Sequence, residues 1–132
     1  GAWNKTHETG YFLVQTRFML VLERGDELWL APLVTNNWLK DGMRIEVVAA
    51  PTRFGPVSYR IKSAVGQGRI EATIEPPTRS VPRRIVLRLR HPEGKAVRAV
   101  TVNGEDYADF DARAETIRLE PGREVIRVRA EY

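Results

Sequence analysis

Apolar and polar residues alternate along the second half of the chain, most clearly at residues 84–90. There Ile85, Leu87 and Leu89 share one parity, and arginines occupy the other parity. Successive side chains of a β-strand point to opposite faces, so this period of two is typical of a strand with one wet side. The alternation recurs at residues 70–74 and 126–130. It predicts strands that turn one face to a core and the other to water.

Turn residues divide the chain into short segments of this kind. Arg24-Gly25-Asp26 separates two apolar segments and predicts a β-hairpin; we interpret this tripeptide as a turn rather than as an adhesion motif. Gly66-Gln67-Gly68 predicts a second hairpin, and residues 35–42 predict a single helical turn that Gly42 can end. The expected strands cover residues 17–23, 27–32, 45–49, 57–65, 69–75, 83–91, 96–102, 116–120 and 124–132.

About nine short strands at regular spacing, with at most a short helical turn, are typical of an all-β sandwich or barrel. We expect an antiparallel two-sheet β-sandwich of jelly-roll-like form. The chain has 132 residues, enough for one domain with its own core. We assign residues 17–132 to the sandwich and residues 1–16, the least strand-like part of the chain, to a linker or to the tail of a preceding domain.

The cysteine count and the hydropathy exclude some classes of site. With no cysteine there is neither a disulfide framework nor a thiolate metal site, and no run of about 18 apolar residues predicts a membrane span. We expect no cofactor and no membrane partner. The compartment stays open, with an extracellular or periplasmic location expected if the parent protein is secreted.

The net charge of +4 raises the question of a nucleic-acid partner. Residues 83–98 are rich in arginine, whereas residues 105–115 are rich in acids. Opposite charges on neighbouring strands are an ordinary way to solvate the outer face of a sheet. No interleaved aromatic and basic residues of the RNA-binding type accompany the arginines. We therefore predict a solvated face and no nucleic-acid partner.

One acidic cluster has the composition of a metal site. Asp106, Asp109 and Asp111 lie within one short segment and could offer oxygen ligands to calcium, but the glycine and the distal glutamate of a calcium loop are missing. The other interpretation is a solvated loop facing the arginines. His91 precedes Pro92 and is expected to be a turn residue rather than an acid or base. No catalytic residue is predicted.

Aromatic side chains offer a second kind of site, because flat apolar rings stack against sugars. Trp29, Trp38 and Tyr59 are the candidate carbohydrate contacts, with Trp3 and Tyr107 as further candidates. Trp29 lies between Leu28 and Leu30, and Trp38 precedes Leu39, so both are also expected as core or domain-contact anchors.

Several segments resemble a known family. The resemblance is to the C-terminal β-sandwich of bacterial glycoside hydrolase-like proteins built on an (α/α)6 barrel. It rests on residues 28–32 (LWLAP), 37–42 (NWLKDG), 50–59 (APTRFGPVSY), 87–92 (LRLRHP), 100–104 (VTVNG) and 110–111 (FD).

This resemblance implies a non-catalytic accessory module that packs on a preceding catalytic domain of the same polypeptide and carries no catalytic residue itself. The alternative is a carbohydrate-binding module that grips a glycan with exposed tryptophans.

Overall fold

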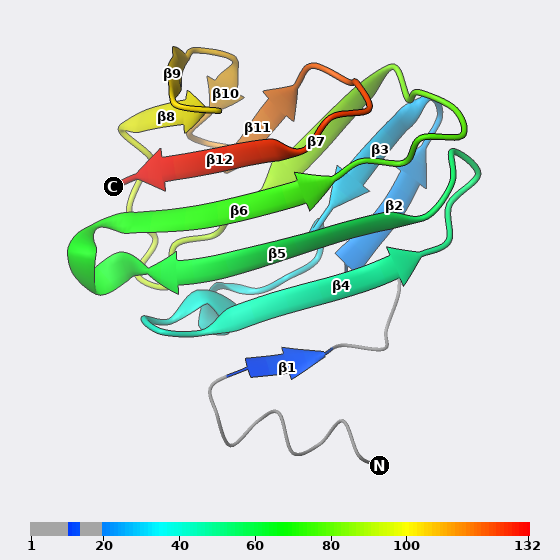
Figure 1. The fold of residues 1–132 in the computed structure, drawn as a ribbon. Coiled ribbons are helices and arrows are strands. Elements are labelled where there is room, and N and C mark those ends of the chain that lie inside the picture. The colour runs from blue at the N-terminus through cyan, green and yellow to red at the C-terminus, as the bar shows by residue number, and fades with distance from the viewer. Residues whose placement is uncertain (1–10, 14–19) are drawn as a thin grey trace.

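A computed structural model describes residues 11–13 and 20–132. Two β-sheets make up the described fold, and Figure 1 looks onto the larger one. The strands of the larger sheet are β1 (Tyr11–Leu13), β4 (Arg44–Ala50), β5 (Val57–Ala64), β6 (Arg69–Glu75), β8 (Ala99–Val102), β9 (Glu105–Tyr107) and β12 (Ile126–Glu131). The strands of the smaller sheet are β2 (Val21–Arg24), β3 (Glu27–Leu30), β7 (Arg84–Arg88), β10 (Phe110–Asp111) and β11 (Thr116–Leu119).

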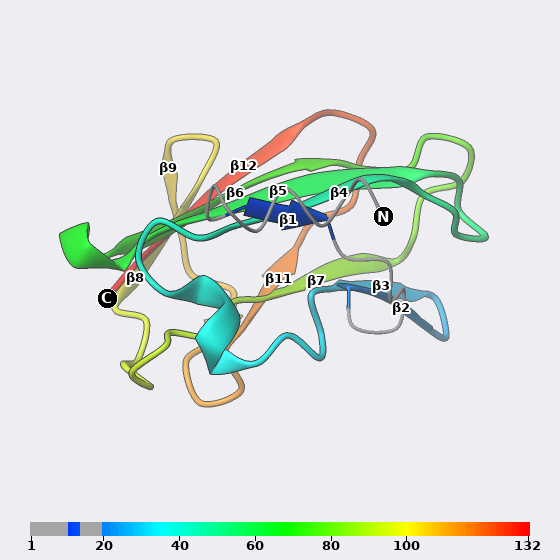
Figure 2. The same cartoon turned by 90° about the horizontal axis from the view of Figure 1, so that it is seen from below.

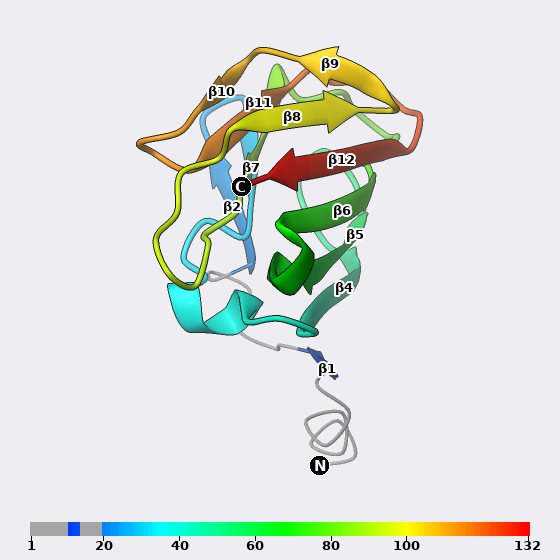
Figure 3. The ribbon, with the colours of Figure 1, turned by 90° about the vertical axis from the view of Figure 1, so that its left-hand side faces the viewer.

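The seven-stranded sheet has the order β1-β4-β5-β6-β12-β8-β9, and the five-stranded sheet has the order β10-β11-β7-β3-β2. Figure 2 shows the two sheets as layers, and Figure 3 shows β8 and β9 curving over one side of the sandwich. The predicted all-β sandwich is confirmed. More strands are present than the nine expected, because β1, β9 and β10 span only two or three residues, too few to show a period of two.

The predicted hairpins are present. β2 pairs antiparallel with β3, and β5 pairs antiparallel with β6. Two pairings are parallel instead: β1 with β4 and β3 with β7. The other pairings between the described strands are antiparallel, as expected for the sandwich.

Residues with apolar side chains fill the space between the layers. In β5 the inward positions Val57, Tyr59, Ile61 and Ser63 are all buried, as a period of two requires. The short 3-10 turn η2 (Asn36–Leu39) occupies the predicted helical segment and buries Leu39 in the core. A second 3-10 turn, η3 (Val65–Gln67), connects β5 to β6.

Parts of the predicted linker and of the first hairpin lie outside the described residues. These are residues 1–10 and 14–19, which include Trp3 and His7. Within the described part of the chain, neither helical turn is long and apolar enough to cross a membrane.

Candidate functional site

The outer face of the five-stranded sheet brings together charged and aromatic side chains from three strands. In β3 the buried Leu28 and Leu30 point to the core, so Glu27 and Trp29 point outward. β7 pairs with β3 so that Arg84 lies beside Glu27 and Val86 beside Trp29. We call this surface the Glu27 face.

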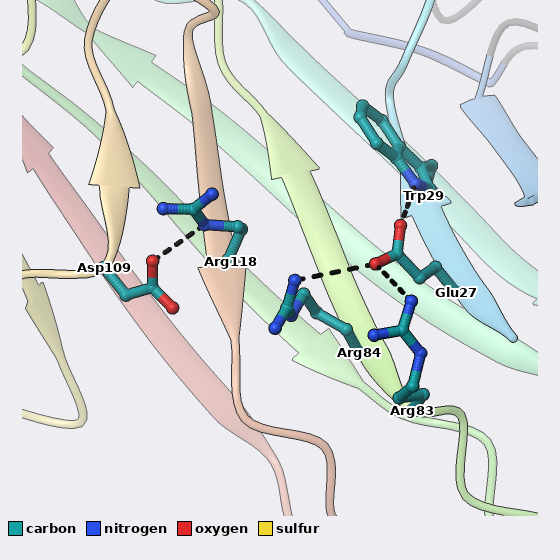
Figure 4. Close-up of polar contacts among 6 residues, drawn as sticks. All are labelled: Glu27, Trp29, Arg83, Arg84, Asp109 and Arg118. Atoms are coloured by element: carbon teal, nitrogen blue, oxygen red, sulfur yellow. Dashed lines mark hydrogen bonds and ion pairs between the residues drawn. The ribbon is translucent and has the colours of Figure 1, made fainter.

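Glu27 is the centre of this face (Figure 4). Its Oε1 accepts a hydrogen bond from the indole Nε1–H of Trp29 at 3.1 Å. Its Oε2 lies 3.1 Å from Nη2 of Arg83 and 3.6 Å from Nη1 of Arg84. The carboxylate therefore meets three donors, with only 18% of its side chain exposed. Such charge-assisted contacts are shorter and stronger than hydrogen bonds between neutral groups.

A second ion pair lies on the neighbouring strand β11. Nε of Arg118 lies 2.7 Å from Oδ1 of Asp109, and the main-chain oxygen of Arg118 accepts the Tyr107 hydroxyl at 2.5 Å. Burial raises the pKa of Tyr107 above its usual value, and the charge of Asp109 raises it further. These contacts tie the β9–β10 corner of the molecule to the Glu27 face.

An apolar layer lies beneath these charges. Val86 sits in register between Trp29 and Arg118, yet only 2% of it is exposed. The guanidinium of Arg24 covers the Trp29 ring at 4.7 Å from its centroid. A hollow of about 140 Å³ adjoins the layer; it is lined by Arg83, Arg84, Tyr107, Asp109, Arg118, Leu119, Glu120 and Pro121.

The chemistry of the Glu27 face follows from these contacts. The carboxylates of Glu27 and Asp109 both accept from guanidinium groups, so their oxygens are engaged by cations of the same sheet. The face can hold a ligand through exposed guanidinium groups and hydrogen bonds. Its carboxylates are placed to support the sheet.

The three predicted carbohydrate contacts do not lie on one face. Trp29 is half-buried on the Glu27 face, and Trp38 lies in η2 packed against the core. Tyr59 is in the core with 1% exposure, and its hydroxyl donates to the main-chain oxygen of Leu20 at 2.7 Å. The prediction that Tyr59 contacts a sugar is therefore wrong, because its position in β5 points inward. A shared platform of Trp29, Trp38 and Tyr59 is not formed.

The predicted metal ligands are also dispersed. Asp109 pairs with Arg118, and Oδ1 of Asp111 accepts the main-chain N–H groups of Arg113 and Ala114, which lower the pKa of Asp111. Asp106 lies on β9 opposite Thr101. No group of three or more potential metal ligands gathers anywhere in the described residues. The predicted calcium site at Asp106, Asp109 and Asp111 is therefore corrected to a turn held by ion pairing and capping.

His91 lies at the other end of β7 and is buried. Its Nδ1 accepts the main-chain N–H of Glu93 at 3.0 Å, and its ring lies 4.8 Å from that of Tyr132. Burial lowers the pKa of His91, and the charge of Lys95 lowers it further. The accepting Nδ1 forms the Pro92 turn, in agreement with its predicted role as a turn residue.

Sequence reasoning missed the partners that organise the Glu27 face. Glu27 and Arg83 are 56 residues apart, so no local spacing connects them. The alternation in β3 did contain a signal: with Leu28 and Leu30 inward, Glu27 and Trp29 had to share the outer face.

No protein-family model matches this chain, and no curated protein is significantly similar to it.

Proposed function

We propose that this chain is a non-catalytic accessory β-sandwich domain of a longer, carbohydrate-active, glycoside hydrolase-like protein. In this proposal it packs on a preceding catalytic domain of the same polypeptide. The observation that carries the proposal is that four carboxylates of the described residues are engaged by other groups of the fold. Glu27 and Asp109 bind arginines, and Asp41 and Asp111 accept main-chain N–H groups.

A glycoside hydrolase needs two carboxyl groups that flank the bond to be broken, one of them protonated at the start of the reaction. The carboxylates of Glu27 and Asp109 are instead each held by arginine side chains, Glu27 by Arg83 and Arg84 and Asp109 by Arg118. In this arrangement the carboxylates contribute to the stability of the sandwich. This supports a structural role for the domain.

The carbohydrate part of the proposal rests on the resemblance of the segments described above. Those segments build the body of the sandwich: residues 28–32 include most of β3, residues 37–42 include most of η2, and residues 50–59 connect β4 to β5. They are parts of a scaffold, which suits an accessory domain. A grip through exposed tryptophans is less well supported, because Arg24 covers Trp29 and Trp38 packs on the core.

The test is to assay this chain, and the protein encoded by the full reading frame that contains it, on a panel of glycosides. The proposal expects turnover by the longer protein and none by the chain. Turnover by the chain that is lost in Glu27→Gln or Asp109→Asn would contradict it. A reading frame without a segment that encodes a preceding catalytic domain would contradict it as well.

A further inference from the structure

A groove of about 490 Å³ crosses the outer face of β4, β5 and β6, the face that Figure 1 views directly. Its polar lining comes from outward positions of three adjacent strands. These residues are Arg44 and Glu46 of β4, Arg60 and Lys62 of β5, and Glu71 and Thr73 of β6. Five of these six residues carry a formal charge at neutral pH, and three of the five are cations.

The cations of this groove form no close ion pair within the described part of the chain. Arg44 lies directly opposite Lys62 and Glu46 directly opposite Arg60 in the β4–β5 register, and Lys62 lies opposite Glu71 in the β5–β6 register. The Glu71 carboxylate is taken by other cations, at 3.2 Å from Arg129 and 3.6 Å from Arg69. Among the described residues, Arg44, Arg60 and Lys62 have no ion pair.

Like charges directly opposite each other on a sheet destabilise it. The Glu27 face avoids this cost by giving Arg83, Arg84 and Arg118 carboxylate partners. The groove retains the repulsion between Arg44 and Lys62. Features that oppose the stability of a fold are expected where a ligand binds. An anion between Arg44 and Lys62 would turn their repulsion into attraction.

The groove also indicates which kind of anion fits. Nucleic acid carries a charge about every 3.4 Å along each strand, and Glu46 and Glu71 would repel phosphates at that density. Among the side chains that the structure describes, the lining contains no aromatic ring on which bases could stack. A polysaccharide whose acidic groups are separated by hydroxyl-bearing rings fits this lining better. Its hydroxyls can donate to the carboxylates and can bond Thr73.

We propose that the groove across β4, β5 and β6 binds an acidic polysaccharide, with its carboxylate groups on Arg44, Arg60 and Lys62. The proposal deepens the proposed function by naming a substrate class for the parent protein, and it rests on that function for the carbohydrate nature of the ligand. The site lies on the outer face of the seven-stranded sheet, whereas Tyr59 points inward from β5 and Trp29 lies on the five-stranded sheet. It would bind its ligand through charge rather than through stacking.

The test measures binding of the chain to sodium polygalacturonate by affinity electrophoresis and calorimetry, with fully methyl-esterified polygalacturonate as the uncharged probe. The binding variant is Arg44→Gln/Arg60→Gln/Lys62→Gln. The matched control is Lys40→Gln/Arg98→Gln/Arg113→Gln, which removes the same charge from exposed positions outside the groove. Thermal unfolding checks both variants; the first should be at least as stable as the parent, because it removes the repulsion of Arg44 and Lys62.

The expected result is binding of the charged polymer alone, weakened at least about tenfold in the groove variant and less than about twofold in the control. Equal weakening in both variants, equal binding of the esterified polymer, or no binding at low salt would overturn the proposal. Tighter binding of single-stranded DNA of equal charge would overturn it in favour of a nucleic-acid partner. Each of these outcomes is independent of the glycoside assays and of the reading frame, so the failure of one proposal can be told from the failure of the other.

Discussion

Tyr59 links the two layers of the sandwich through one hydroxyl group. The residue belongs to β5 of the seven-stranded sheet, and its hydroxyl donates to the main-chain oxygen of Leu20, which directly precedes β2 of the other sheet. Burial raises the pKa of this phenol well above its usual range, so the hydroxyl remains a donor at any pH at which the protein is handled. The aromatic ring fills the core.

Replacement of Tyr59 by phenylalanine should therefore lower the free energy of unfolding by about 0.5–1.5 kcal/mol, because the Leu20 carbonyl loses one of its two donors and keeps only the Ala31 N–H. Urea denaturation measures this. Tyr107→Phe is the matched control: its hydroxyl also donates to a main-chain oxygen, but at an exposed position where water can replace it. The control should lose less than about 0.5 kcal/mol. Equal losses would contradict the buried role of Tyr59.

Glu27 offers a second comparison of the same substitution at two sites. Glu27→Gln should cost about 1–2 kcal/mol of unfolding free energy, since it removes the charge that balances Arg83 and Arg84 on a largely covered side chain. Glu93→Gln removes a pair with Lys95 that is exposed on both sides, and should change stability by less than about 0.5 kcal/mol. The Glu27 effect should shrink in high salt; an effect no larger than that of Glu93→Gln would show that the cluster does not stabilise the sheet.

His91 should make the stability of the domain depend on pH. Its pKa is lower in the folded chain than in the unfolded chain, so the fold favours the neutral ring. The stabilisation is complete above the ordinary histidine pKa of about 6.5 and is lost as the pH falls from there through the lowered pKa.

The measurement is the free energy of unfolding between about pH 7.5 and 5.5 in the parent and in His91→Asn. The amide oxygen of asparagine can still accept the Glu93 N–H but does not titrate. The variant should show a flatter dependence on pH than the parent. A parent slope that survives in His91→Asn would be the contrary result.

At the scale of elements, the β8–β9 hairpin depends on the backbone of its turn. Asn103 and Gly104 both have positive φ, at 52° and 84°, as a two-residue type I′ turn requires. Asn103 also fixes the hairpin to β12: its N–H donates to the Arg127 oxygen at 2.7 Å, and its Oδ1 accepts the Arg127 N–H at 2.8 Å.

Two glycine substitutions separate backbone strain from crowding. A Cβ added at Gly104 or at Gly122 meets no atom within 4 Å, but only Gly104 has a positive φ. Gly104→Ala should therefore cost about 1–2 kcal/mol from left-handed backbone strain. Gly122→Ala should be neutral or stabilise by up to about 1 kcal/mol. Chemical denaturation of the two variants distinguishes them, and an equal effect would contradict the assigned turn.

The strands were predictable from local sequence, but the connections between some of them were not. Period-two alternation located β5, β6, β7 and β12, and turn chemistry located the β2–β3 hairpin. The expected strands 83–91 and 96–102 are consecutive, as are 116–120 and 124–132, but the chain crosses between the members of each pair from the five-stranded to the seven-stranded sheet. Local turn residues allow both outcomes, and packing of distant strands decides between them.

The candidate site was less predictable for the same reason. Alternation implies that Tyr59 points inward with Val57 and Ile61, so its burial could have been expected. The contacts of Glu27 with Arg83 and of Asp109 with Arg118 depend on which strands become neighbours, and the sequence pattern contains no such information. The acidic residues looked like metal ligands until their basic neighbours were known.

On the scale of the whole molecule, the two outer faces use charge in different ways. The Glu27 face pairs its arginines with carboxylates from other strands, and Arg90 pairs with Glu115 in the way predicted for the segments 83–98 and 105–115. The groove face leaves Arg44, Arg60 and Lys62 without an ion pair in the described chain. We infer that the Glu27 face stabilises the fold and that the groove face binds a ligand.

The most direct measurement is an NMR titration of the ¹⁵N-labelled chain with a short oligogalacturonate. We expect chemical shift changes that saturate at the main-chain amides of β4, β5 and β6 around Arg44, Arg60 and Lys62, and no change in the shift of the Trp29 indole N–H. Changes centred on Trp29 and the Glu27 face, with constant shifts at the groove amides, would contradict a ligand site in the groove.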